Sequence, residues 1–267
     1  MTIDRVYAKL IYKILREGDN ISTRNSDVKR IFAEKIEINR TPLISLRKTA
    51  WRNSLREFEW ILSGSNKIED LNPKVRHWWN PWVVEGEVPF NYSRQFRHWN
   101  AKGDEEGFDQ LRYLEEGIKE HPFSRRNVIT TWNTEEMASS LCPITNCHST
   151  ILQAFVSEQN ELSLVMYQRS SDVIVGLGAN LLQYWAFLLY LAHKCDKKVG
   201  FFTWIGGDCH IYEEHFELAK KILEVSDQMT FTPTLIYTPT SEDFKAMDFD
   251  LEGEYSPILQ DKAEMVV

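Results

Sequence analysis

Apolar residues follow two regular patterns along the chain, one with helical spacing and one with alternation. The clearest helical stripe is Trp51, Leu55, Phe58 and Leu62, at positions i, i+4, i+7 and i+11 of one segment. Residues 179–194 are long and strongly apolar, which is typical of a buried central helix. Helices are predicted over residues 4–16, 50–63, 105–120, 179–194 and 213–225.

Short apolar segments, in part alternating and β-branched, predict strands between these helices. The predicted strands are residues 36–38, 127–132, 151–157, 162–168 and 200–205. The polar stretch 19–26 is predicted to be a loop, and residues 66–100 a loop-rich region. Because strands and helices do not alternate in regular βαβ units, we expect an α+β fold rather than a doubly wound sheet.

The chain has 267 residues and contains no internal repeat, low-complexity tract or Gly/Ser linker. Since single hydrophobic cores grow to roughly 250–300 residues, one domain over residues 1–267 is expected. Hydrophobic residues make up 43% and charged residues 26%, as in soluble globular proteins. The net charge of -8 disfavours nucleic acid as a partner, but a few arginines can still bind a small anionic substrate.

The sequence predicts a cytoplasmic protein with reduced thiols. No apolar run reaches the roughly 20 residues of a membrane span, and the start MTIDRVYAKL lacks the apolar segment of a secretory signal. The four cysteines are Cys142, Cys147, Cys195 and Cys209. No CxxC spacing supports zinc binding by these thiols and His210, so no metal is expected.

Cys147, followed by His148, is the candidate nucleophile, and Arg169 lies on the next predicted strand. A thiolate rather than a thiol attacks carbon, and a neighbouring guanidinium can lower the pKa of the thiol while it also holds a phosphate. A lone cysteine is more often a buried structural residue. The neighbouring His148 and the later Arg169 shift the interpretation toward a nucleophile.

Other polar groups have two interpretations each. Arg125-Arg126 is either a solvated charge pair or a phosphate clamp. His210 and Tyr212 share one face of an extended segment, where they either bind sugar hydroxyls or are satisfied polar core groups. Glu57 and Glu59 diverge by roughly 160° on a helix and cannot form a simple carboxylate pair.

Several motifs follow one another in a specific order. They are Pro42-Leu43, Arg56-Glu57-Phe58-Glu59-Trp60, Ser124-Arg125-Arg126, Trp132-Asn133, Cys147-His148, Tyr167 to Asp172, Gly176 to Asn180, Gly207-Asp208 with His210 and Tyr212, and Glu264-Met265-Val266-Val267. In this order the motifs resemble the thymidylate synthase superfamily over essentially the whole chain. That superfamily includes the phage pyrimidine-nucleotide hydroxymethylases. The resemblance implies a mixed β-sheet with a buried central helix, and a sheet face that forms a homodimer interface.

The resemblance also implies one-carbon transfer from 5,10-methylenetetrahydrofolate, a co-substrate, to C5 of dUMP without a metal. Cys147 would attack C6 of uracil, and Glu57 and Tyr92 would relay protons through water. Asn180 would hydrogen-bond O4 and N3–H of uracil, whereas dCMP-specific relatives carry Asp there. From the residues alone, Asn180 can equally be a helix N-cap.

The remaining site residues are likewise implied by the resemblance. Arg24, Arg169 and Ser170 would hold the phosphate, and Arg125 and Arg126 would be donated to it by the partner subunit. His148 and Arg169 complete the catalytic group of Cys147, Glu57 and Tyr92. The other substrate residues are Gln168, Asp172, His210 and Tyr212, and the folate residues are Trp79, Trp82, Asp172 and Val267.

Departures from ordinary thymidylate synthases favour a different product. Glu59 stands where they have an apolar residue, Asn91 precedes Tyr92, and Gly178-Ala179 replaces a Pro-Phe pair, which leaves room for water at the methylene intermediate. We therefore expect 5-hydroxymethyl-dUMP, formed in the host cytoplasm if the protein is phage-encoded. Reductive methylation to dTMP with release of dihydrofolate is the alternative. A dCMP hydroxymethylase and an inactive nucleotide- or RNA-binding homologue are further alternatives.

Overall fold

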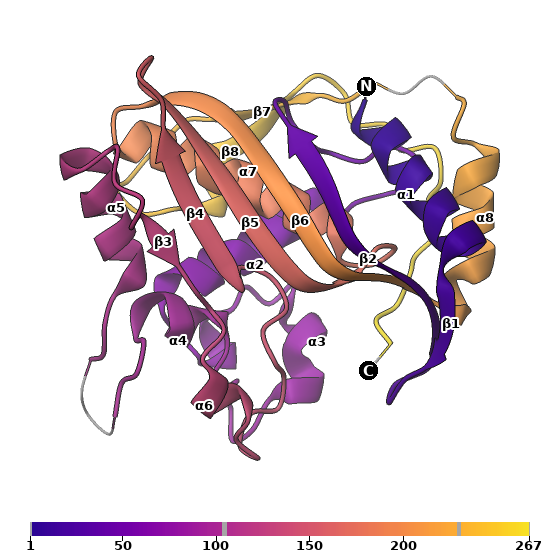
Figure 1. Cartoon of the computed structure of the whole chain (residues 1–267), viewed down its shortest axis with the longest axis horizontal. Helices are drawn as coiled ribbons and strands as arrows, with labels where there is room; N and C mark the ends of the chain where they lie inside the picture. The colour runs from indigo at the N-terminus through magenta and orange to yellow at the C-terminus, as the bar shows by residue number, and fades with distance from the viewer. Residues whose placement is uncertain (1, 103–105, 229–230, 267) are drawn as a thin grey trace.

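A six-stranded mixed sheet organises the chain, whose computed structural model describes residues 2–102, 106–228 and 231–266 (Figure 1). The strand order is β1-β2-β6-β5-β4-β3, in which β5 and β6 are parallel and the other neighbours antiparallel. The strands are β1 (Asp19–Ser22), β2 (Asp27–Ile38), β3 (Val128–Ile129), β4 (Ile151–Val156), β5 (Glu161–Asp172) and β6 (Lys198–Tyr212). A separate antiparallel pair is formed by β7 (Thr234–Tyr237) and β8 (Phe249–Glu252).

The helices cover one face and the ends of the sheet. The longer ones are α1 (Ile3–Glu17), α2 (Trp51–Ser63), α5 (Gln110–Glu120), α7 (Leu177–Lys194) and α8 (Phe216–Glu224). The shorter ones are α3 (Arg76–Trp79), α4 (Tyr92–Arg97), α6 (Thr134–Met137), and the 3-10 turns η1 (Ile68–Asp70), η2 (Asn80–Trp82), η3 (Glu213–His215) and η4 (Ala246–Asp248). No described helix is long and apolar enough to cross a membrane.

Helix α7 is the centre of the core. It connects the parallel strands β5 and β6 and lies behind the sheet together with α2 (Figure 1). It is buried on nearly every side, as expected of a helix that is apolar all round. Phe58 of α2 packs edge-on against Tyr184 and Phe187 of α7. The α+β class and the mixed sheet with a buried central helix are therefore confirmed.

Several predicted boundaries were wrong. The predicted strands 36–38 and 200–205 are only parts of β2 and β6. The predicted loop 19–26 contains β1, an exposed edge strand whose polar residues give no alternation to detect. The predicted strand 127–132 shortens to β3 because the following residues bond to other segments, including Thr131 N–H to Ser149 O at 3.0 Å.

The opposite face of the sheet carries exposed apolar residues. Ile151 and Phe155 of β4 are 52% and 62% exposed, whereas the alternate residues of this strand are buried toward the helices. Phe201 of β6 is 44% exposed. In Figure 1 this face of β4, β5 and β6 is turned to the viewer, and no helix of the described chain covers it. An exposed apolar surface of this kind is typical of a protein contact.

Candidate active site

Cys147 lies just before β4, and a tyrosine of α4 holds it in place. Tyr92 is the first residue of α4, whose N-terminus is capped by the side chain of Asn91. Tyr92 Oη accepts a hydrogen bond from Cys147 N–H at 2.7 Å and lies 3.1 Å from Cys147 Sγ. Since the oxygen accepts from the backbone, its own proton is available to the sulfur. Asn91 has this capping role whatever the product of the reaction.

His148 supports Tyr92 from behind. The two rings stack with centroids 4.0 Å apart, and His148 Nδ1 lies 2.7 Å from Tyr184 Oη. Burial lowers the pKa of His148 to about 3, so the imidazole is neutral near pH 7. A neutral ring cannot stabilise a thiolate by its charge. His148, which the resemblance places in the catalytic group, contacts Tyr92 and Tyr184 and supplies no charge to the sulfur.

Arg169 joins the strand β5 to the cysteine segment. Its backbone N–H donates to Cys147 O at 2.9 Å, and its guanidinium donates to the carbonyl oxygens of Asn146 and Thr145 at 2.8 and 2.9 Å. Burial raises the pKa of Cys147, and the hydrogen bond from Tyr92 and the charge of Arg169 lower it only in part. The effect of Arg169 expected from the sequence is present, but burial outweighs it in the free protein.

A network of buried amides lies next to this group on β5. Gln168 Oε1 accepts from Trp204 Nε1 at 2.9 Å, and Gln168 Nε2 donates to Asn180 Oδ1 at 3.1 Å. Asn180 Nδ2 in turn donates to Gln183 Oε1 at 3.1 Å. The N-cap of α7 is Gly176, so the alternative interpretation of Asn180 as the cap is wrong.

Glu57 of α2 ends the amide network. Its Oε2 accepts from Gln183 at 2.8 Å and its Oε1 from Trp79 Nε1 at 2.7 Å. Burial raises the pKa of Glu57, and the two hydrogen bonds oppose that rise. A carboxyl with a raised pKa is suited to exchange protons near neutral pH. Trp82 lies edge-on to Trp79 at 5.8 Å, so the two predicted folate residues are neighbours beside Glu57.

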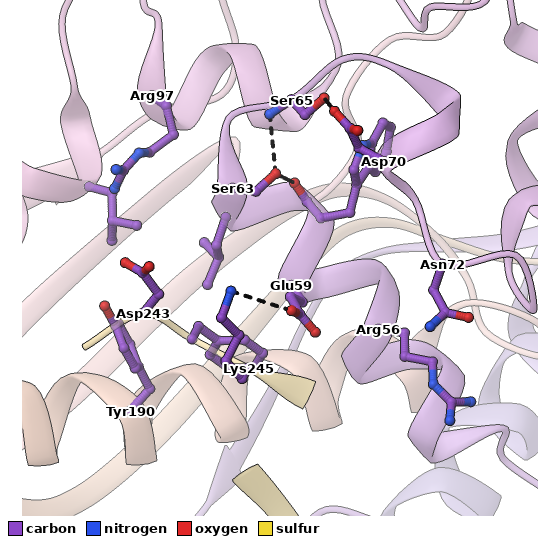
Figure 2. A pocket seen from close by; sticks show the side chains of 14 residues that line it. Arg56, Glu59, Ser63, Ser65, Asp70, Asn72, Arg97, Tyr190, Asp243 and Lys245 are labelled. Atoms are coloured by element: carbon purple, nitrogen blue, oxygen red, sulfur yellow. Dashed lines mark hydrogen bonds and ion pairs between the residues drawn. The ribbon is translucent and has the colours of Figure 1, made fainter. Parts of the chain in front are cut away.

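The side chain of Glu59 points away from Glu57, toward residues 245 and 246. Its Oε2 accepts Ala246 N–H at 3.0 Å, and its Oε1 lies 3.7 Å from Lys245 Nζ. Figure 2 shows both side chains at a cavity of about 530 Å³, which Tyr190 of α7 also borders. None of the residues that line this cavity is a predicted site residue. The roughly 160° divergence of Glu57 and Glu59 thus separates them completely, and Glu59 does not shape the space around the thiol.

The predicted sugar residues lie at the end of β6. His210 Nδ1 is 3.0 Å from Asp208 Oδ1, and Asp208 Oδ2 accepts from Arg30 at 2.8 Å. Asp208 therefore orients the imidazole and leaves Nε2 for a ligand. Tyr212 packs edge-on against His210. Asp172 lies beside His210 across the parallel ladder, and its Oδ1 caps two backbone N–H groups of the next turn.

Within one subunit, the predicted phosphate residues Arg125 and Arg126 lie far from Arg24. Arg24 is exposed in the turn between β1 and β2, at one edge of the sheet. Arg125 and Arg126 are exposed before β3, at the opposite edge. Five strand spacings, or about 24 Å, separate these edges, while Ser170 lies between them on β5.

The C-terminal tail reaches the same turn as Arg24. Asn25 Nδ2 donates to Val266 O at 3.4 Å. Val267, predicted to contact the folate, lies outside the described residues. Among the residues that the structure describes, no group of three or more His, Cys, Asp or Glu side chains could hold a metal ion.

Sequence reasoning missed three residues of this site. Gln183 follows Asn180 at i+3 on α7, a spacing that could have suggested the pair. Trp204 reaches Gln168 of β5 from β6, and no local pattern indicates that contact. Asp208 stands two positions before His210 on β6, a spacing that places both side chains on one face of the strand.

Comparison with known proteins assigns the family. A model of the family described as thymidylate synthase matches residues 5–267. The chain belongs to the thymidylate synthase family. Curated thymidylate synthases of Buchnera aphidicola subsp. Acyrthosiphon pisum, strains APS and Tuc7, are 33% identical over 265 residues, covering 94% of this chain and 98% of each relative. The thymidylate synthase of strain 5A is 34% identical over 254 residues, covering 91% and 94%.

Membership of the thymidylate synthase family confirms the recognition made from the motifs. It makes the protein a folate-dependent one-carbon transferase acting at C5 of a pyrimidine nucleotide. Thymidylate synthases use methylenetetrahydrofolate as the source of that carbon, as the sequence predicts.

Proposed function

We propose that this protein converts dUMP to dTMP by reductive methylation, with 5,10-methylenetetrahydrofolate as donor of both carbon and hydride. This replaces 5-hydroxymethyl-dUMP as the preferred product. The observation that carries the change is the position of Glu59, which binds Ala246 N–H at a separate cavity and brings no polar group to the thiol. The relatives named thymidylate synthase also support it.

The first step uses the group around the sulfur. Cys147 Sγ forms a bond to C6 of uracil, and the electrons of the C5–C6 double bond move toward O4. Tyr92 Oη, 3.1 Å from the sulfur, stabilises the thiolate by hydrogen bonding before attack. Asn180 holds N3–H and O4, and Glu57 exchanges protons with the O4 side through water.

The second step transfers the carbon. C5 bonds to the folate methylene and then loses its proton to a water assisted by Tyr92, and the folate nitrogen leaves with a proton relayed through water from Glu57, which gives an exocyclic methylene. Trp79 and Trp82, beside Glu57, bound the folate position. A hydride from tetrahydrofolate reduces the methylene, the sulfur leaves C6, and dTMP and dihydrofolate are released. Hydroxymethylation would instead need a water at that carbon.

The substrate phosphate requires a second subunit in this proposal. Arg24, Arg169 and Ser170 bind it from one chain, and Arg125 and Arg126 come from the partner across the exposed apolar sheet face. Two observations support the homodimer: the exposed Ile151 and Phe155, and the position of the arginine pair at the far sheet edge. His210 and Tyr212 then contact the deoxyribose.

The test is the stoichiometry of products. Purified protein is incubated with dUMP and methylenetetrahydrofolate, the nucleotide is identified by mass, and dihydrofolate is followed by its absorbance. We expect dTMP and dihydrofolate in a one-to-one ratio. Formation of 5-hydroxymethyl-dUMP without dihydrofolate would instead support hydroxymethylation, the second candidate function.

A further inference from the structure

A one-directional chain of hydrogen bonds crosses the site, and it begins at an indole. Trp204 donates to Gln168, Gln168 to Asn180, Asn180 to Gln183, and Gln183 to Glu57, with distances of 2.8–3.1 Å. An indole N–H can only donate, so it fixes which end of the Gln168 amide faces it. Each following amide is then fixed by the one before it. The carboxylate of Glu57 can only accept, so it is a suitable last acceptor for this run of donors.

The orientation of Asn180 determines what it can still bind. Its Oδ1 already accepts from Gln168, and its Nδ2 already donates to Gln183. One lone pair on Oδ1 and one hydrogen on Nδ2 remain. Uracil offers N3–H to the first and O4 to the second. Cytosine offers a bare N3 and an amino group, so both contacts would be mismatched.

We propose that Gln183 is a positioning residue that sets the preference of this enzyme for uracil over cytosine, because it holds the Asn180 amide and connects it to Glu57. This inference rests on the proposed function, in which Asn180 faces the base. Gln183 is fully buried, and its Nε2 also donates to Ser54 O at 2.9 Å. Turning its amide over would bring Oε1 against the oxygens of Ser54 and Glu57.

The same hydrogen bond acts on the proton relay. The bond from Gln183 lowers the pKa of Glu57 against the larger effect of burial, which raises it. Removing Gln183 therefore moves the pKa of Glu57 upward. Base preference and the pH dependence of turnover are coupled through one side chain.

The experiment replaces Gln183 with Met, which keeps the length of the side chain and removes the amide. We expect the ratio of kcat/KM for dUMP to that for dCMP to fall on the order of tenfold, since the Asn180 amide is then held at one end only, by Gln168. The acidic limb of the pH profile for dUMP should move to higher pH. The matched control is Gln110→Met, because Gln110 is a buried glutamine that bonds Gln95 O and Thr130 O away from the site. It should retain both the ratio and the profile.

A folded Gln183→Met protein with unchanged ratio and profile would overturn the proposal. If this variant does not fold, Gln183→Glu decides. A glutamate oxygen still accepts the hydrogen bond from Asn180, so the preference for dUMP should persist. Its carboxyl also faces Glu57, so the acidic limb of the pH profile should move to higher pH. Loss of the preference for dUMP over dCMP, or an acidic limb at unchanged pH, would contradict the proposal.

The proposed function can fail separately. If the unmodified protein does not turn over dUMP, the same variants are compared by calorimetric binding of dUMP and dCMP. A binding ratio that narrows in Gln183→Met then supports the role of Gln183, and an unchanged ratio refutes it.

Discussion

Replacing Tyr92 with Phe removes one oxygen from the cysteine site and keeps the ring that stacks on His148. That oxygen accepts Cys147 N–H at 2.7 Å and lies 3.1 Å from Cys147 Sγ. Of the effects that lower the pKa of Cys147, its hydrogen bond is the largest. The substitution should therefore raise the pKa of the thiol further and slow its reactions at neutral pH.

The size of the effect follows from the contact. A hydrogen bond to a charged group contributes about 1.5–3 kcal/mol, which corresponds to a roughly ten- to hundredfold smaller thiolate fraction at fixed pH. The more basic thiolate is a better nucleophile, which recovers about half of this loss on a logarithmic scale. We expect Cys147 to react about three- to tenfold more slowly with an aromatic disulfide. The unpaired Cys147 N–H should also cost about 1–3 kcal/mol of stability.

The assay measures mixed-disulfide formation across a pH series, with peptide mass spectrometry to assign the label to Cys147. Tyr184→Phe is the control, because Tyr184 loses an equally buried hydroxyl that contacts His148 rather than the sulfur. It should lower stability and leave the thiol rate nearly unchanged. An unchanged rate in folded Tyr92→Phe, or an equal slowing in both variants, would refute this account of the thiol.

Four further predictions concern other parts of the site. Glu59→Leu should leave the ratio of methyl to hydroxymethyl product unchanged in the mass assay, because its side chain lies at the separate cavity. Burial raises the pKa of Glu57 above its ordinary 4.5, so the folded protein holds this proton more tightly than the unfolded chain does. The free energy of unfolding should therefore fall as the pH rises from 4.5 through the raised pKa. In Glu57→Gln this part of the pH dependence should be absent, as measured by urea unfolding across pH. Burial lowers the pKa of His148 to about 3, so the unfolded chain binds this proton before the folded protein does as the pH falls below 6.5. The free energy of unfolding should therefore decrease toward acid pH, and His148→Gln should reduce that decrease in the same unfolding series. Inactive Cys147→Ala and inactive Arg126→Glu proteins, mixed and allowed to exchange subunits, should recover roughly a quarter of the activity, whereas no recovery would contradict a shared phosphate site.

The sequence predicts the core of this fold better than its edges. The apolar stripe containing Phe58 and the continuous apolar run of α7 are patterns that burial imposes directly. Strand β1 escapes prediction because an exposed edge strand needs no apolar face, and β7 and β8 lie in a region without clear periodicity. The ends of β5 and β6 extend past their apolar portions into polar site residues.

For the site as well, the sequence predicts which residues take part better than it predicts their contacts and burial. Motif order predicts Cys147, Asn180 and Arg169 as site residues, but the contact of Tyr92 with the sulfur joins segments 55 positions apart. The neutral state of His148 depends on burial, which no local pattern reports. Helical geometry predicts that Glu57 and Glu59 diverge, and the structure adds what Glu59 binds instead.

The central claim is that the methylene intermediate is reduced by hydride, and isotope transfer tests it directly. The protein is incubated with dUMP and methylenetetrahydrofolate that carries deuterium at the hydride-donating carbon of the pterin, and the nucleotide is analysed by mass spectrometry. The account predicts dTMP whose methyl group contains one deuterium. A product that carries a hydroxymethyl group and no deuterium would contradict it.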